Sequence, residues 1–277
     1  NGSLAALSGH DLTDSSPRRL EVRVNGRSVY LPTAITVSWS SLGITPDDIE
    51  RIELVRGSNV PTYGSNAIMG SVEITTKSPL QESGTHLHFT VGDKNTRNVN
   101  VRSNFEFGTG YGQLRMAHRE NDGFDYADGI KGDGTPDNTP SIGPIDDNTN
   151  VDHVVFSSVF KPTLADTVHF EVGVSNGEFG VGDTDSIDEF GDDTNRSYWV
   201  TTGWAQAGEV EKWEWNFSLY DISMEQEVDK LLSDLLGVTP AFVNTNIGPD
   251  FLLEIGLGKR ESTLLETELE YQYAFSE

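Results

Sequence analysis

From Thr85 onward, apolar and polar residues alternate over stretches long enough to form long β-strands. The stretch Val99–Phe107 places valines and phenylalanines on one face and Asn, Arg and Glu side chains on the other. Similar stretches lie near residues 168–175, 213–219 and 265–275, and weaker ones bring the expected total to about eight strands. Most have the ~9–11 residues that a tilted strand needs to cross a bilayer. The pattern therefore predicts an antiparallel sheet of long strands with one apolar face.

The connections between these strands alternate between short and long. The short ones are Gly108–Gly110, Pro162–Asp166 and Gly208–Val210. The long ones are expected near residues 120–150, 177–196 and 223–259. Transmembrane β-barrels sort their connections in this way, with short periplasmic turns and long outer loops. The alternation therefore favours such a barrel over a soluble β-sandwich.

Aromatic residues gather at strand ends that a meander would bring together. Trp213 and Trp215 begin one expected strand, and Tyr271, Tyr273 and Phe275 end the next. Their position fits the aromatic girdle of a membrane barrel. It fits ordinary cross-strand aromatic packing equally well.

Charge divides the chain into two parts. The 277 residues carry a net charge of −25. Residues 1–80 hold seven Lys or Arg and eight Asp or Glu, a net charge of −1, which leaves −24 for residues 81–277. An acidic surface repels phosphate groups, so nucleic acid binding is not expected. The sequence has no cysteine, which excludes disulfides and thiolate metal sites.

Residues 20–77 predict short mixed elements in place of long strands. Leu20–Val24 alternates and is followed by Asn25-Gly26, a two-residue hairpin signal. Thr45 and Pro46 begin a short helix, since Thr can cap it and Pro suits its first position. The change of pattern places a domain boundary near residue 80, with one domain over residues 1–80 and a second over 81–277.

Three motifs occur here in order. Residues 22–30 read Val-Arg-Val-Asn-Gly-Arg-Ser-Val-Tyr, residues 48–57 read Asp-Ile-Glu-Arg-Ile-Glu-Leu-Val-Arg-Gly, and residues 63–77 run from Tyr-Gly to Thr-Lys. In order and spacing they resemble the second half of the plug domain of TonB-dependent outer-membrane receptors. That family reads Ile-Glu-Arg-Ile-Glu-Val-x-Arg-Gly-Pro and then Tyr-Gly-x-x-Ala-x-x-Gly-x-Ile-Asn-Ile. The sequence departs from the pattern at Ser58, Glu73 and Thr75.

The resemblance implies a mixed α/β plug domain inside an antiparallel transmembrane β-barrel. Receptors of this kind have barrels of about 22 strands, wide enough to need a plugged lumen. We therefore expect a fragment, with the C-terminal half of the plug and the first part of the barrel. Its roughly eight strands should form an open, curved sheet, because an eight-stranded barrel has no room for a folded plug.

The resemblance also implies which residues matter. The plug-motif residues expected to shape or lock the plug are Arg51, Glu53, Arg56, Gly57, Tyr63, Gly64 and Gly70. In this family the charged ones pair with each other and with carboxylates of the barrel wall; the alternative is that they lie solvated on a surface. The residues expected to face the lumen are His86, His88, Arg102, Glu106 and Glu171. The apolar residues expected to build a small plug core are Ile49, Ile52, Leu54, Ile68 and Ile74.

The implied activity is TonB-dependent uptake of a scarce, bulky solute across the bacterial outer membrane. The solute would belong to the ferric siderophore, haem or cobalamin class. No enzyme activity, cofactor or resident metal is expected. The expected partners are outer-membrane lipid, a ligand such as a metal chelate, and the TonB–ExbB–ExbD complex. The segment that TonB contacts should lie outside these 277 residues.

Two loop features suggest other readings. Asp122, Asp125, Asp128, Asp133 and Asp137 could hold calcium, which would suit a secreted acidic β-rich binding or adhesin module. Their spacing misses the EF-hand pattern, so a solvated acidic loop is the simpler reading. A short amphipathic helix is also predicted, because apolar residues recur at helical spacing. They are Val228, Leu231, Leu232, Leu235 and Leu236.

Overall fold

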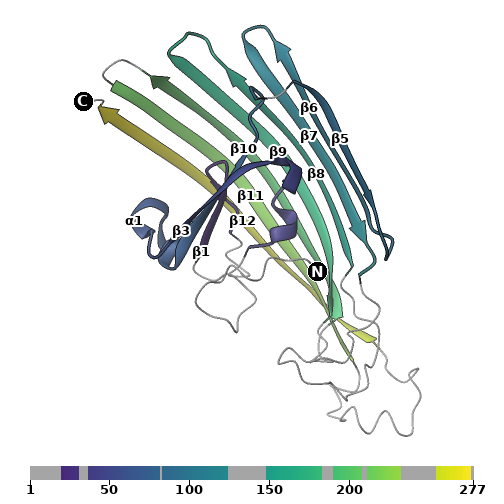
Figure 1. The fold of residues 1–277 in the computed structure, drawn as a ribbon. Helices are drawn as coiled ribbons and strands as arrows, with labels where there is room; N and C mark the ends of the chain where they lie inside the picture. The colour runs from purple at the N-terminus through teal and green to yellow at the C-terminus, as the bar shows by residue number, and fades with distance from the viewer. Residues whose placement is uncertain are drawn as a thin grey trace, which may run out of the picture.

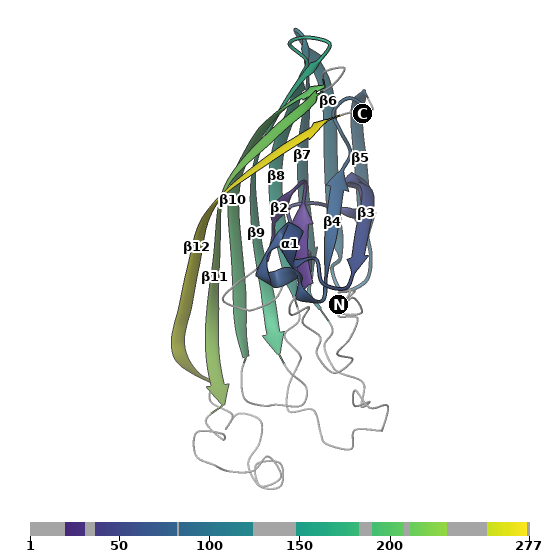
Figure 2. The same cartoon turned by 90° about the vertical axis from the view of Figure 1, so that its left-hand side faces the viewer.

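The chain forms two β-sheets, one small and one large, in a computed structural model. The structure describes residues 20–30, 37–81, 83–123, 148–182, 190–207, 211–231 and 254–275. Within these ranges the small sheet has four strands and the large sheet has eight. The small sheet lies on the concave side of the large one (Figures 1 and 2). No strand belongs to both sheets among the described residues.

The small sheet has the strand order β2-β1-β4-β3. The strands are β1 (Leu20–Val24), β2 (Arg27–Ser28), β3 (Ile49–Arg56) and β4 (Gly70–Thr76). β1 runs parallel to β4, and the other two pairs are antiparallel. The turn between β1 and β2 holds Asn25 and Gly26 at φ values of 50° and 81°. Such left-handed conformations match the hairpin that Asn-Gly predicts.

Short helices connect these strands. They are η2 (Trp39–Ser41), η3 (Pro46–Asp48), α1 (Val60–Tyr63) and η4 (Ser65–Ile68). The predicted helix start at Thr45 is confirmed, because the side chain of Asp48 folds back onto it. One carboxylate oxygen of Asp48 accepts hydrogen bonds from the Thr45 amide at 2.9 Å and from its hydroxyl at 2.8 Å.

The apolar core of the small sheet comes mostly from β1, β4 and the segments beside η2. Its buried members are Leu20, Val22, Val24, Val29, Tyr30, Val37, Leu42, Val72 and Ile74. Ile49 packs against this core, as expected. The prediction is wrong for Ile52, Leu54 and Ile68, which are 57%, 57% and 46% exposed. The reason for the first two is that β3 forms the outer edge of the small sheet, beyond β4.

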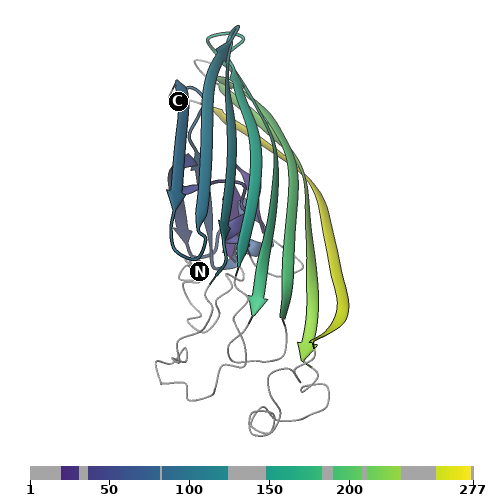
Figure 3. The same ribbon diagram turned by 90° about the vertical axis from the view of Figure 1, so that its right-hand side faces the viewer.

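The large sheet is an antiparallel meander in which each strand pairs with the next in the chain. The strands are β5 (Gly84–Val91), β6 (Arg97–Phe107), β7 (Gly110–Asn121), β8 (Thr149–Phe160), β9 (Asp166–Gly182), β10 (Phe190–Ala207), β11 (Glu211–Leu231) and β12 (Glu254–Phe275). β5 and β12 are its two edges. Figure 3 shows the curvature from the side away from the small sheet. The expectation of eight strands in an open, curved sheet is confirmed.

Two of the predicted long connections begin later and end earlier than expected. β9 continues to Gly182 and β10 begins at Phe190, because residues 177–182 still pair with residues 190–195. β11 likewise continues to Leu231, and β12 begins at Glu254. Val228 and Leu231 therefore lie in a strand, which contradicts that part of the helix prediction. The other residues of the predicted helix, and the acidic loop from Asp125 to Asp137, lie outside the described residues.

The large sheet has a polar inner face and an apolar outer face. On β6, Asn100, Arg102 and Asn104 are buried on the inner face, and Val99 and Val101 alternate onto the outer one. The outer face also carries Phe105, Phe107, Val168, Phe170, Val172, Val174, Trp213, Trp215 and Phe217, as predicted. The aromatic residues expected at neighbouring strand ends are partners in the strand register, since Trp213 pairs with Tyr273 and Trp215 with Tyr271.

Phenylalanine rings cover two glycines on the outer face. The Phe107 and Phe160 rings meet edge to face at 5.1 Å, and the rings of Phe105 and Phe156 stack at 6.4 Å. A Cβ atom at Gly110 would lie 2.7 Å from the Phe160 ring, and one at Gly112 the same distance from Phe105. The glycines thus make room for the aromatic layer. No helix among the described residues is long and apolar enough to cross a membrane.

Candidate functional site

The two sheets meet through polar and charged side chains on the inner face of the large sheet. Pairing between strands places these side chains in rows. One row runs through Arg102, Arg115, Val155, Gly173 and Trp199. The neighbouring row toward the short turns contains Asn104, Gln113, Ser157, Glu171 and Thr201. The small sheet contacts these rows at two places.

The first contact joins η3 to β6. The Arg102 guanidinium donates a hydrogen bond to the Asp47 carbonyl oxygen at 2.6 Å and lies 3.7 Å from a carboxylate oxygen of Asp48. The Asn100 amide donates to the Thr45 hydroxyl at 2.6 Å. The side chains of Arg102 and Asp48 are 6% and 0% exposed. The burial of Asp48 is therefore compensated by a cation from the other sheet.

A second polar contact lies beside it at the edge of the interface. His88 of β5 hydrogen-bonds to the Asp47 carboxylate. This bond is the main reason why the pKa of Asp47 lies below its ordinary value. A depressed carboxylate pKa stabilises the fold above the ordinary value of ~3.9, and this stabilisation is lost as the pH falls through the lowered pKa. Both side chains are about half exposed, so solvent screens the pair.

The second contact joins the β1–β2 hairpin to β7, β9 and β10. One carboxylate oxygen of Glu171 accepts from the Arg115 guanidinium at 2.9 Å and from the Asn25 side-chain amide at 3.1 Å. Its other oxygen accepts from the Trp199 indole N–H at 2.9 Å. The Arg27 guanidinium lies 4.2 Å from the centre of the Trp199 ring. One largely buried carboxylate thus links three strands of the large sheet to the tip of the hairpin.

Trp199 is fixed between the two sheets by glycines. A Cβ atom at Gly43 would lie 2.5 Å from the end of the indole ring, and one at Gly173 would also overlap it. The ring is 3% exposed and packs with Val155, Tyr220 and Ile222. Both glycines therefore leave space that Trp199 fills.

Arg27 is a buried cation. Burial lowers the pKa of Arg27 to about 10, and the Glu171 carboxylate opposes this effect. The guanidinium therefore remains charged at neutral pH, where its positive charge is attracted to the face of the indole ring.

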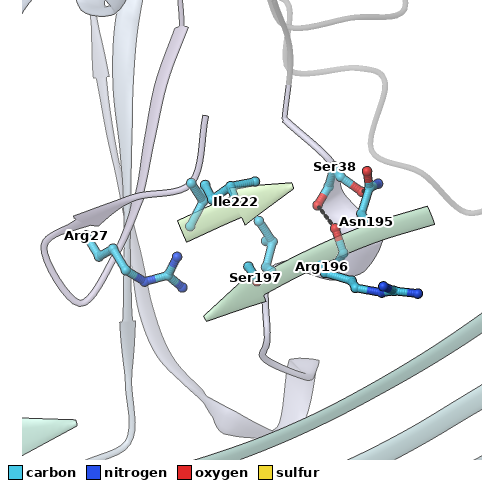
Figure 4. A pocket seen from close by; sticks show the side chains of 9 residues that line it. Arg27, Ser38, Asn195, Arg196, Ser197 and Ile222 are labelled. Atoms are coloured by element: carbon cyan, nitrogen blue, oxygen red, sulfur yellow. Dashed lines mark hydrogen bonds between the residues drawn. The ribbon is translucent and has the colours of Figure 1, made fainter. Parts of the chain in front are cut away.

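Two cavities border this second contact. The loop-side cavity has a volume of about 20 Å³ and is lined by Arg27, Ser38, Asn195, Ser197 and Ile222, among others (Figure 4). The Asn195 amide donates to the Ser38 hydroxyl there at 3.2 Å. The turn-side cavity has a volume of about 290 Å³. The residues that line it include Arg23, Arg51, Glu73, His169, Glu214 and Ser218. No group of three His, Cys, Asp or Glu side chains within the described part of the chain could hold a metal ion.

All three plug-motif charges are exposed, and two of them pair with each other. Arg51 and Glu53 form an ion pair at 3.4 Å, with both side chains more than half exposed. Arg56, at the end of β3, is exposed, and the described residues give it no ion-pair partner. Tyr63 lies under the guanidinium of Arg23, which is 5.1 Å from the ring centre. Arg51 also lines the turn-side cavity, together with His169 and Glu214 of the large sheet.

The motif glycines have the conformations expected of them. Gly57, Gly64 and Gly70 have φ values of 96°, 82° and 156°. At Gly70 a Cβ atom would also lie 2.5 Å from the Val55 carbonyl oxygen on the neighbouring strand. A side chain there would force β3 and β4 apart, which explains why the motif has glycine.

The residues expected to face the lumen all lie on the inner face, but they differ in what they contact. Arg102 and Glu171 contact the small sheet. His88 contacts Asp47, and His86 lies opposite Arg102 on β5. Glu106 is exposed near the end of β6.

Sequence reasoning missed several interface residues, among them Asn25, Arg27, Arg115 and Trp199. From the sequence, Asn25 is recognised only as part of a two-residue turn. Arg27 is recognised only as the residue that follows this turn. The signal available in the sequence was Arg115 at an inward position of an alternating strand, since a charge on such a face requires a partner.

Fold and interface together define the class of protein: a β-barrel wall whose polar inner face holds a small α/β domain. Residues 5–71 match the family model described as TonB-dependent Receptor Plug Domain. The chain is 28% identical over 117 residues to the vitamin B12 transporter BtuB of Vibrio cholerae serotype O1. That match covers 42% of this chain and 19% of the transporter.

Solved structures show the same fold. The copper transporter OprC superposes with a TM-score of 0.58 at 14% identity, covering 76% of this chain and 31% of OprC. The ferric yersiniabactin uptake receptor FyuA from Yersinia pestis gives a TM-score of 0.52 at 14% identity, covering 93% of this chain and 41% of FyuA. Residues 5–71 therefore belong to the plug-domain family of TonB-dependent receptors, and the chain as a whole has the fold of part of such a receptor. The family consists of transporters and receptors, not enzymes.

Proposed function

We propose that this chain supplies part of the plug and the first wall strands of a receptor that imports a scarce, bulky solute through the outer membrane. Residues 1–80 would act as plug and residues 81–277 as wall. The solute would be of the ferric siderophore, haem or cobalamin class, and the TonB–ExbB–ExbD complex would supply the energy. The relative named for vitamin B12 and the neighbour named for ferric yersiniabactin support the cobalamin and ferric siderophore classes.

The observation that carries the proposal is the buried polar interface between the sheets. A soluble sandwich would pack its sheets through apolar side chains. Here the large sheet turns its apolar face outward and meets the small sheet through Arg102, Glu171 and Asn100. Such an arrangement suits a wall surrounded by lipid and a domain that can be displaced within it.

Growth on single solutes tests this function. The full-length receptor would be expressed in an outer-membrane strain that lacks its own siderophore, haem and cobalamin receptors. We expect one ferric siderophore, haem or cobalamin to restore growth when it is the sole source of iron or of cobalamin. Failure of all three classes, with the receptor present in the outer membrane, would contradict the proposal.

The outer face gives a prediction about depth in the membrane. Val172 lies on the outer face near the middle of β9, and Glu178 lies on the same face six residues closer to the loops. We expect Val172→Arg to destabilise the folded barrel by about 2–4 kcal/mol and Glu178→Arg by about 0–1 kcal/mol. Urea titration of the refolded full-length receptor in lipid vesicles measures both. Equal costs for the two variants would show that the outer face does not contact the bilayer.

A further inference from the structure

The loop-side and turn-side cavities lie on opposite sides of a single inward position of the large sheet. The inward residues of β10 follow in the order Asn195, Ser197, Trp199 and Thr201. Asn195 and Ser197 line the loop-side cavity, and Thr201 lines the turn-side cavity. Trp199 therefore stands between the two cavities along the strand.

The partition between the cavities consists of four residues, here termed the latch: Asn25 and Arg27 of the hairpin, with Glu171 and Trp199 of the large sheet. Arg27 also lines the loop-side cavity, and Asn25 lines the turn-side cavity. The hairpin tip thus closes the space between the sheets from one side while the indole ring closes it from the other. Moving Asn25 and Arg27 away from Glu171 and Trp199 would join the two cavities.

The interface is tighter on the other side of the latch. Gln113, Arg115 and Val155, on β7 and β8, are 1%, 1% and 0% exposed. Opening a passage there would expose these side chains and break the charge pair between Arg115 and Glu171. Along β9–β11 a cavity already exists, so a passage requires less rearrangement.

The turn-side cavity has a lining suited to a polar solute. Arg23 and Arg51 contribute positive charge, and Glu73 and Glu214 contribute negative charge. Hydroxyl groups from Thr201 and Ser218, and the ring of His169, add hydrogen-bonding groups. A solute with several donors and acceptors could exchange its water for these groups, whereas an apolar one could not.

We propose that the solute route runs along β9–β11 through both cavities and that the latch is its gate. This inference rests on the proposed function. In the closed state the Arg27–Trp199 and Asn25–Glu171 contacts hold the hairpin against the wall. Displacement of the hairpin breaks both contacts and opens a continuous polar passage toward the short turns.

Ion conductance of the full-length receptor in planar bilayers, without TonB, tests the gate. Trp199→Leu removes the ring that Arg27 covers and the N–H that Glu171 accepts. We expect the open fraction to rise about tenfold, as loss of a desolvated cation–π contact implies. The matched control is Trp204→Leu, on the same strand but the outer face, where the indole donates to Asp166. Its conductance should stay at the wild-type level.

A second variant keeps the test valid if Trp199→Leu does not assemble. Asn25 has a positive φ, which Asp tolerates, so Asn25→Asp should preserve the turn. It places a second carboxylate beside that of Glu171, and the repulsion should open the gate at neutral pH. Acidification, which neutralises such pairs, should close it again.

Different results would contradict the gate and the proposed function. Unchanged conductance in an assembled Trp199→Leu or Asn25→Asp receptor would overturn the gate. An equal rise in Trp204→Leu would also overturn it, because the leak would then reflect general damage to the barrel. The proposed function fails by a different result, namely no growth on any solute with the wild-type receptor, and conductance does not depend on that result.

Discussion

Replacing Glu171 by leucine should loosen the plug more than any other single change at the second contact. Arg115 would lose its carboxylate partner while remaining 1% exposed, and Asn25 and Trp199 would lose an acceptor. Breaking a buried pair by removing one partner costs about 3–5 kcal/mol. We therefore expect the free energy of plug unfolding in the full-length receptor to fall by about that amount.

Urea titration measures this loss if the plug carries its own reporter. Ser58 is exposed, and these 277 residues contain no cysteine, so Ser58→Cys gives a site for a fluorescent label. The matched control is Glu178→Leu, which removes an exposed carboxylate from the same strand and should change the unfolding free energy little. A shift for Glu171→Leu no larger than that of the control would show that the carboxylate does not anchor the plug.

Replacing Arg102 by methionine should have a comparable effect at the first contact. Asp48 would remain fully buried without the cation that lies 3.7 Å from it, and the Asp47 carbonyl would lose its donor. An uncompensated buried carboxylate again costs about 3–5 kcal/mol. The same labelled receptor and the same urea titration report the loss.

Arg97 supplies the control for this change. It lies on the same strand and pairs with Glu120 at 3.2 Å, but its side chain is 60% exposed. Surface ion pairs contribute about 0–1 kcal/mol, so Arg97→Met should be nearly neutral. If Arg97→Met and Arg102→Met destabilise the plug equally, burial of the Arg102–Asp48 pair does not determine how the plug is held.

The sequence was informative where short-range rules decide the structure. Alternation placed the strands and their faces, because successive side chains point to opposite sides of a sheet. The Asn25-Gly26 turn and the Thr45 cap were also predictable, since each depends on a few neighbouring residues. The plug motif identified the family because several motifs recur at fixed spacing.

The missed features depend on how parts of the chain that are distant in sequence come together. Ile52 and Leu54 alternate like core residues, and only the position of β3 at the sheet edge leaves them exposed. Trp199 resembles any strand aromatic until Gly43 and Gly173, far apart in the sequence, are brought against its ring. The extension of β9 and β10 into a predicted loop pairs glycines and acidic residues with Phe179, Val181 and Phe190, a mixture that lacks clear alternation on both strands.

TonB dependence of uptake tests whether the receptor is an active transporter. Cells would carry the full-length receptor as the sole route for the labelled solute that restores growth, with TonB present or deleted. We predict saturable uptake that requires TonB. Equal uptake in both strains would contradict it, because the receptor would then act as a passive pore or a surface binding protein.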